Sequence, residues 1–199
     1  MEPTKVRRTA AETRELVLDV AGQLFYTQGI RATGVDAVAA GAAIAPTTLY
    51  RLFASKDDLV DAYVRNADAA YREWIGGVTR GRTARRRILA LFEALAGVTR
   101  EDWFRGCPFL ITLAEYPDRA SAPNVSAQAT KSWVRDTLRG LAAEHLGSSS
   151  ARATKLADQL ALVLEGVYAS TQELGADGPA AQAPSVVAML LDGAGRGGA

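Results

Sequence analysis

The chain has 199 residues, 48% of them apolar, and a formal net charge of +1. This apolar content is enough for one large or two small domains with a hydrophobic core. No apolar run approaches the roughly 18 residues of a membrane span, and the N-terminal segment lacks the apolar centre of a signal peptide, so we expect a cytoplasmic protein with no membrane partner. The single cysteine, Cys107, excludes an internal disulfide, and with one histidine, His145, it leaves too few soft ligands for a typical zinc site. We therefore expect neither a metal nor a cofactor.

The first predicted helix runs from about Ala11 to Gln28, where apolar residues recur at helical spacing and Gly29 follows as a stop. Before it, Lys5, Arg7 and Arg8 form a short basic arm. Such an arm can lie along a phosphate backbone, because releasing counterions favours binding, or it can be a solvated tail.

The stretch from Gly29 to Lys56 predicts two short helices joined by a tight turn. Thr33 and Asp36 have the spacing of a capping box, so the first of these helices should begin at Gly34 or Val35 and end at Gly41. Pro46 suits the first position of the second helix, which should extend to Phe53. Leu49, Leu52 and Phe53 would face the core.

Small hydroxyls, a phenol and a guanidinium remain on the outward face of the second helix. Threonine and arginine can contact base edges in the major groove, and tyrosine hydroxyls commonly hold phosphate oxygens. An ordinary surface helix could carry the same residues, because helix-turn-helix geometry also occurs in folds that bind no DNA. The candidate DNA-binding residues are Thr33, Thr47, Thr48, Tyr50, Arg51 and Lys56.

The segments LFYTQG and ATGVDAVAAGAAIAPTTLYRLFASKDDL closely resemble the DNA-binding region of TetR-family transcriptional repressors. The resemblance implies that Thr48 to Phe53 lie in the recognition helix and that Lys56 contacts phosphate. One residue departs from the family pattern. Ala45 stands where the family usually has a capping serine, and a missing cap of this kind typically costs about 1 kcal/mol.

The rest of the chain also predicts helices, and no segment shows sustained strand alternation. Ser55 and Asp58 form a second capping-box pattern that opens a long helix ended by Gly76 and Gly77. The arginine-rich run that follows opens an amphipathic helix and is expected to be a solvated face able to pair with acidic residues. Further predicted segments are a short irregular helix within 103–116, a loop at 117–124, helices at about 125–146, 151–174 and 185–191, and a disordered glycine-rich end.

The expected fold is therefore all-α, with about nine helices and no internal repeat. By the resemblance, residues 1–56 form a helix-turn-helix DNA-binding domain, and residues 57–199 form a ligand-binding and dimerisation domain.

Aromatic residues concentrate in the second of these domains, and the resembled fold gathers them around one pocket. Their chemistry predicts a mainly hydrophobic effector with one or two polar groups, for which Thr112, Glu115, Thr171 and Gln172 are the nearest polar candidates. The alternative is a closed aromatic core without a ligand. The candidate pocket residues are Trp74, Phe92, Trp103, Phe104, Phe109, Leu113, Tyr116, Trp133, Val163 and Val167.

Together these features imply a homodimeric repressor that binds a near-palindromic double-stranded DNA operator and is released by a small hydrophobic effector. The resembled family dimerises through its last two helices, which here would use Leu160, Leu164, Val167, Val187 and Leu191. An enzyme is disfavoured, because a Ser or Cys nucleophile usually needs a base and His145 lies near a predicted helix end among polar residues. A helical partner- or ligand-binding protein without sequence-specific DNA binding remains the alternative. Cys107 is expected to be a buried structural thiol, with a redox switch as its rival.

Overall fold

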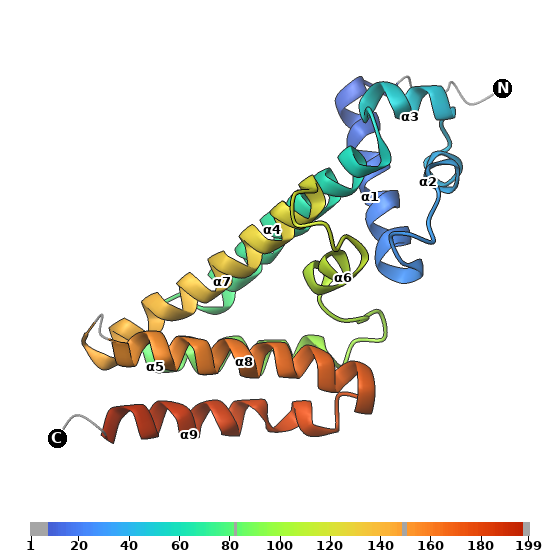
Figure 1. Ribbon diagram of the computed structural model, residues 1–199. Helices are drawn as coiled ribbons and strands as arrows, with labels where there is room; N and C mark the ends of the chain where they lie inside the picture. The colour runs from blue at the N-terminus through green and yellow to red at the C-terminus, as the bar shows by residue number, and fades with distance from the viewer. Residues whose placement is uncertain (1–7, 82, 149–150, 197–199) are drawn as a thin grey trace. The chain divides into compact units, whose positions relative to one another are not determined.

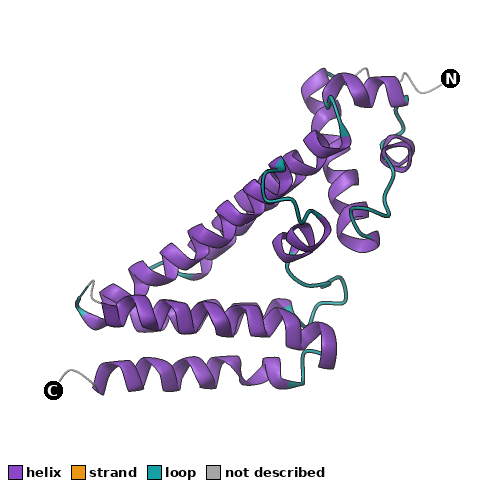
Figure 2. Ribbon diagram, viewed as in Figure 1, coloured by secondary structure: helices purple, strands orange, loops and turns teal. Residues whose placement is uncertain are grey.

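The computed structural model describes residues 8–81, 83–148 and 151–196. Within these ranges the chain forms α-helices, one short 3-10 helix and loops, without any strand (Figure 2). The prediction of an all-helical fold with about nine helices is confirmed. In chain order the elements are α1 (Ala10–Gln28), α2 (Val35–Gly41), α3 (Pro46–Leu52), α4 (Lys56–Val78), α5 (Ala84–Val98), α6 (Pro108–Glu115), α7 (Ala122–Leu146), α8 (Ala151–Leu174), the 3-10 helix η1 (Pro179–Gln182) and α9 (Ala183–Arg196).

The chain divides into two compact units, each built from segments that are not contiguous in sequence. The first comprises the described residues up to Ala67 together with Pro108–Ala127, and the second comprises Asp68–Cys107 together with the described residues from Gln128 onward. The boundary after residue 56 that the sequence suggested stays a prediction. No helix among the described residues is long and apolar enough to cross a membrane.

In the first unit, α1 packs against both α2 and α3, and α2 packs against α3. Apolar side chains from each helix are fully buried, which is the main source of stability for helices this short. The ring of Phe25 on α1 meets that of Tyr63 on α4 edge to face, with centroids 5.6 Å apart. The buried apolar residues include Val17, Ala21, Phe25, Ile30, Val38, Leu49, Leu59 and Val60.

In the second unit, α9 lies alongside both α5 and α8 (Figure 1). Its inward face buries Val187 and Leu191 completely, while α5 contributes Ile88 and Phe92, both also completely buried. Each of these helices therefore carries an apolar stripe that the other two cover.

Most helix ends lie where the sequence placed them. Gly29 caps α1 with a φ of 94°, and Gly147 follows α7 with a φ of 63°; both values are easy only for glycine. Ser55 caps α4: its hydroxyl oxygen accepts from the backbone N–H of Asp58 at 3.0 Å and the hydroxyl donates back to the carboxylate at 2.8 Å.

Three predicted boundaries were wrong. Gly76 and Gly77 do not end α4, which continues to Val78, and the predicted loop at 117–124 already contains the first residues of α7. The last helix is longer than the predicted 185–191 at both ends, because it begins at Ala183 and continues to Arg196. A glycine in a helix costs only about 1 kcal/mol relative to alanine, so packing of neighbouring apolar residues overrides this cost at Gly76, Gly77 and Gly193. The remaining glycine-rich residues, 197–199, lie outside the described residues.

The arginine-rich start of α5 makes ion pairs within the second unit, as the sequence suggested. Arg85 donates to Asp192 on α9 at 2.9 Å, and Arg87 donates to Glu144 on α7 at 2.7 Å. These pairs are largely exposed and so contribute little to stability.

Candidate functional site

Helix α3 has one buried face and one exposed face. Leu49 is completely buried and Phe53, just after the helix, is 4% exposed, whereas Thr47 and Arg51 are exposed and Tyr50 is 50% exposed. Thr48 is half-buried. The buried face anchors the helix, so its hydroxyl, phenol and guanidinium groups are available to a ligand outside the chain.

The turn between α2 and α3 is a tight helix-ending motif in which an alanine, Ala43, takes the left-handed position that glycine usually occupies. Ile44 N–H donates to the Ala39 carbonyl at 3.0 Å, and Ala43 N–H donates to the Ala40 carbonyl, also at 3.0 Å. This pair of bonds defines a Schellman motif, which places Ala43 in the left-handed region at a φ of 52°. The motif fixes the direction in which the chain leaves α2 for α3.

Helix α2 approaches α1 closely at this turn because Gly41 has no side chain. A Cβ added to Gly41 would lie 2.7 Å from Cγ1 of Val20 on α1, closer than real Cβ atoms approach. The small residues of the turn therefore let α2 cross α1 at short distance. At the start of α3, Ala45 makes no side-chain capping bond and Pro46 takes the first helical position, as expected from the sequence.

The predicted capping box of Thr33 with Asp36 was wrong. Gly34 is the N-cap of α2 and makes no side-chain capping bond. The Thr33 hydroxyl instead donates to the Gly29 carbonyl at 2.8 Å, and the side chain is 1% exposed. The hydroxyl thus satisfies the end of α1 rather than the start of α2, and its DNA contact stays a prediction.

Glu115, the last residue of α6, holds the turn between α1 and α2. Its two carboxylate oxygens accept from the backbone N–H groups of Ile30 at 3.1 Å and Arg31 at 2.5 Å. The Arg31 guanidinium donates back to the Glu115 carbonyl at 2.7 Å. No local sequence signal could have indicated this contact, because 84 residues separate Arg31 from Glu115.

The segment after α6 is tied to the start of α4 as well. The Tyr116 hydroxyl donates to the Asp57 carboxylate at 2.9 Å, and partial burial together with this bond raises the pKa of Tyr116 above its usual range. The Asn124 amide donates to the Tyr116 carbonyl at 2.5 Å. Glu115 and Tyr116 therefore hold two parts of the first unit, the turn after α1 and the start of α4.

Lys56, the first residue of α4, is half-buried, and its ammonium donates to the Arg31 carbonyl at 3.4 Å. The ammonium of Lys56 therefore lies close to the turn between α1 and α2 that Glu115 holds. Of the predicted basic arm, Arg8 is exposed, and Lys5 and Arg7 lie outside the described residues.

The predicted pocket residues are distributed over both units. Phe109, Leu113 and Tyr116 belong to the first unit and the other seven to the second. Phe92, Phe109 and Val167 are buried, Trp103 is 59% exposed, and the remaining six are half-buried. The common pocket therefore stays a prediction.

Within the second unit, three of these aromatic side chains have defined partners. Phe104 stacks on Tyr168 with centroids 6.1 Å apart, Trp74 stacks on Tyr71 at 5.6 Å, and the Arg72 guanidinium lies 4.3 Å from the centre of the Trp133 ring. Two tyrosines that the sequence analysis did not select thus accompany the predicted residues.

The residues predicted to form the dimer surface do not lie on a surface. Leu160, Leu164 and Val187 are completely buried within the chain itself, as is Leu191, and Val167 is 2% exposed. That prediction was wrong, because the same helical stripe that looked available for a partner is covered by α5, α8 and α9. The large apolar side chains that α8 and α9 do expose are Leu162 (72%), Leu174 (61%) and Met189 (64%).

The helix-turn-helix region matches a family model described as bacterial regulatory proteins of the tetR family, over residues 17–63. This range contains α2, α3 and the turn between them. Among curated proteins, none matches the chain.

Solved structures resemble the chain over nearly its whole length. SCO4454, a TetR-family transcriptional regulator from Streptomyces coelicolor, is 28% identical with a TM-score of 0.87 and covers 94% of this chain and 97% of its own. A protein from Streptomyces avermitilis assigned to the TetR transcriptional regulators is 31% identical with a TM-score of 0.80, covering 92% and 97%. A TetR transcriptional regulator from Chloroflexus aurantiacus, 24% identical, shares the fold with a TM-score of 0.81, covering 94% and 97%.

Proposed function

Because the chain belongs to the TetR family of transcriptional regulators, we propose that it is a repressor which binds a near-palindromic operator as a homodimer. A small, mainly hydrophobic effector releases it from DNA. In this proposal residues 1–56 are the DNA-binding domain, residues 57–199 bind the effector and form the dimer, and the protein acts in the cytoplasm without enzymatic activity.

The exposed face of α3 is the observation that carries the proposal. Within the matched range, Tyr50 and Arg51 are exposed on a helix whose opposite face is anchored by the completely buried Leu49. Arginine is the side chain most often used to read guanine in the major groove, and tyrosine hydroxyls commonly hold phosphate. Arg51 is thus assigned to a base edge, Tyr50 and Lys56 to phosphates, and Thr47 and Thr48 to the adjoining groove.

Release by an effector is a matter of linkage. A ligand weakens DNA binding only to the extent that it binds the released conformation more tightly than the DNA-bound one. Two recognition helices meet successive major grooves when they are about 34 to 36 Å apart, so a small change in their spacing is enough. Helix α4, which continues from the first unit into the second, is the element assigned to transmit that change.

The test is footprinting on the DNA upstream of the protein's own gene, followed by affinity measurements with Arg51→Ala at fixed salt. Losing a contact to a base edge should lower the affinity for the protected site by about 1 to 3 kcal/mol and relax specificity at one position. Because Arg51 is exposed, the fold should be intact by circular dichroism.

Arg65→Ala is the matched control, since Arg65 is an exposed arginine of the same unit that pairs with Asp61 on its own helix. It should leave affinity close to wild type. Wild-type affinity in Arg51→Ala would contradict the assignment of α3. A lack of any protected site would favour the alternative, a helical binding protein without sequence-specific DNA recognition.

A further inference from the structure

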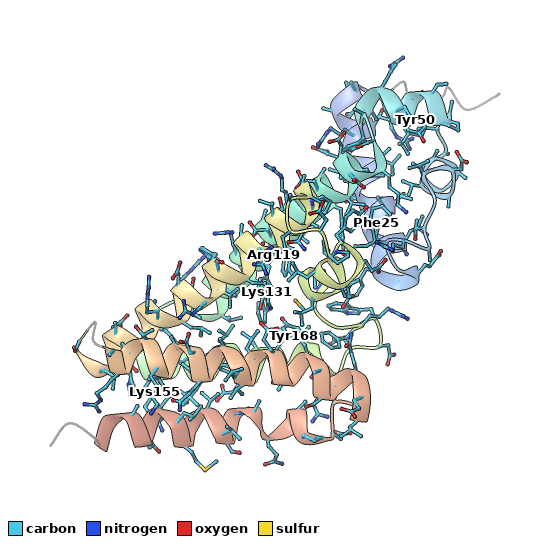
Figure 3. All side chains as sticks on the ribbon, in the orientation of Figure 1. Phe25, Tyr50, Arg119, Lys131, Lys155 and Tyr168 are labelled. Carbon is cyan, nitrogen blue, oxygen red and sulfur yellow. The ribbon has the colours of Figure 1, made fainter. Side chains whose placement is uncertain are left out.

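A cluster of polar side chains from α4, α7 and α8 lies within the second unit. Lys131 on α7 and Tyr168 on α8 point toward one another (Figure 3), with the ammonium 5.7 Å from the centre of the phenol ring. The same ammonium forms an ion pair with Glu165 on α8 and lies 3.8 Å from the Cys107 sulfur. The Tyr168 hydroxyl is 3.1 Å from that of Tyr71 on α4. We refer to Tyr71, Lys131, Glu165 and Tyr168 as the Glu165 cluster.

Each tyrosine of the Glu165 cluster has an aromatic ring stacked on it. The Phe104 ring is nearly parallel to that of Tyr168, and the Trp74 ring is nearly parallel to that of Tyr71. Gln172, one turn beyond Tyr168, donates to the Arg105 carbonyl at 2.6 Å and so fastens the segment carrying Phe104 to α8. Flat apolar faces therefore adjoin the polar groups.

Two polar atoms here have no hydrogen-bond partner among the described residues. They are Oε2 of Glu165 and Oγ1 of Thr171, which lies one turn from Tyr168 on α8. Buried polar atoms are nearly always paired in native proteins, so each one without a partner requires an explanation. A carboxylate oxygen can only accept, and so Glu165 Oε2 calls for an N–H or O–H donor.

The other polar candidates of the C-terminal sequence are already engaged. The Thr112 hydroxyl donates to the Pro108 carbonyl at 2.8 Å, Glu115 binds the turn after α1, and Gln172 binds Arg105. Unlike these groups, Glu165 Oε2 and Thr171 Oγ1 are buried polar atoms without any hydrogen-bond partner among the described residues.

The charge of the Glu165 cluster favours a neutral molecule. Lys131 and Glu165 offset one another, and burial raises the pKa of Tyr168 well above its ordinary value and that of Tyr71 above its usual range, so both phenols are neutral. An ionised ligand would lose its hydration without gaining an unpaired opposite charge. Access from solvent exists, because the Glu165 side chain is 34% exposed and that of Lys131 19%.

We propose that the Glu165 cluster binds a neutral aromatic molecule bearing a hydroxyl or N–H group, which donates to Glu165 Oε2 while its ring packs against the flanking aromatic side chains. The inference names the chemical class of the effector and so rests on the proposed function.

Calorimetric titration of the full-length protein, without DNA, tests the inference with three probes of one ring system. 2-Naphthol offers a hydroxyl donor, 2-methoxynaphthalene an acceptor only, and 2-naphthoate an anion. Because its hydroxyl can donate to the Glu165 carboxylate, 2-naphthol should bind about tenfold or more tightly than 2-methoxynaphthalene. The anion 2-naphthoate should bind more weakly than 2-naphthol. This comparison uses the wild-type protein and does not depend on a variant folding.

Glu165→Gln should bring the affinities of 2-naphthol and 2-methoxynaphthalene to within about threefold of one another. Asp158→Asn is the matched control, because Asp158 is a carboxylate of the same helix that pairs with Arg135 at the surface, and it should keep the tenfold preference. Equal binding of the two neutral probes, tighter binding of 2-naphthoate, no binding of 2-naphthol at millimolar concentration, or an unchanged preference in folded Glu165→Gln would each overturn the inference. These titrations contain no DNA, so their failure is distinct from a failure of operator binding in the footprinting experiment.

Discussion

Ala43 occupies a backbone conformation that suits glycine. Its φ of 52° is set by the two hydrogen bonds that end α2, and a left-handed conformation costs an L-residue roughly 1 to 2 kcal/mol. Ala43→Gly should therefore raise the free energy of unfolding by up to about 1 kcal/mol, after allowance for the greater freedom of glycine in the unfolded chain. Chemical denaturation measures the change.

Ala40→Gly provides the comparison within the same helix. Ala40 is exposed in the regular part of α2, where glycine should lower the free energy of unfolding by about 0.5 to 1 kcal/mol. If both substitutions destabilise the protein equally, the strain assigned to Ala43 is absent.

Gly41 should tolerate a methyl group poorly, although it lies in a helix. In an open helix position Gly→Ala usually stabilises, but here the new Cβ would meet Val20, whose branched side chain has little rotamer freedom. Gly41→Ala should lower the melting temperature, with an overpacking cost of about 1 to 3 kcal/mol offset in part by helix propensity. Gly140→Ala, in α7 with nothing within 4 Å of the added atom, should raise it. Stabilisation by both changes would show that α2 can move away from α1 without cost.

At the level of elements, α6 and the turn between α1 and α2 are joined through one carboxylate. Glu115→Gln keeps the shape of the side chain but replaces one accepting oxygen with a donor that faces a backbone N–H. Hydrogen bonds to charged groups contribute about 1.5 to 3 kcal/mol, so we expect unfolding to require about 1 to 2 kcal/mol less for this half-buried group.

Glu93→Gln, at an exposed position on α5, is the control and should change stability by less than about 0.5 kcal/mol. Hydrogen exchange adds a local measurement, since the amide protons of Ile30 and Arg31 should exchange faster in Glu115→Gln. Unchanged protection at both amides would mean that the carboxylate does not hold the turn.

Local patterns predicted the elements well, because each depends on residues close in sequence. Gly29, Ser55 and Pro46 mark helix ends through their own backbone or side-chain chemistry, and the structure places them as expected. The spacing of Leu49, Leu52 and Phe53 predicted which face of α3 is turned to the core, and Leu49 and Phe53 are buried as expected.

Features that depend on distant residues could not be predicted in this way. Thr33 and Asp36 have the spacing of a capping box, yet the N-cap of α2 is Gly34, and the Thr33 hydroxyl is directed to the carbonyl of Gly29 instead. The partly buried ion pair of Glu165 with Lys131 joins residues 34 positions apart in the chain, so no local pattern predicted it. Likewise, an apolar stripe alone did not tell whether α8 and α9 cover each other or a partner.

At the level of the whole molecule, the proposed dimer should form through the side chains that α8 and α9 expose. The double variant Leu162→Glu, Met189→Glu should sediment as a monomer, because burying a charge in the dimer interface is costly. It should also lose operator binding, because two linked DNA-binding domains are needed to meet successive major grooves. Deleting α9 is a poorer test, since Val187 and Leu191 fill the core of the chain itself.

The double variant should keep its helical content, as exposed side chains support no core. Val125→Glu, a 52% exposed position in the first turn of α7, is the matched control and should remain dimeric. A double variant that sediments as a dimer and binds the operator would place the interface elsewhere.

The division of the first unit into two stretches of sequence limits how this protein can be recombined with its relatives. A chimera with a single crossover after residue 67 would take Arg31 from one parent and α6 from the other. The backbone N–H of Arg31 would then have its acceptor only if the second parent also carries a carboxylate at position 115. Exchanging residues 108–127 together with residues 1–67 keeps Glu115, Tyr116 and Asn124 with the segments to which they are hydrogen-bonded. Transfer of DNA specificity between such regulators is therefore expected to need two inserts rather than one.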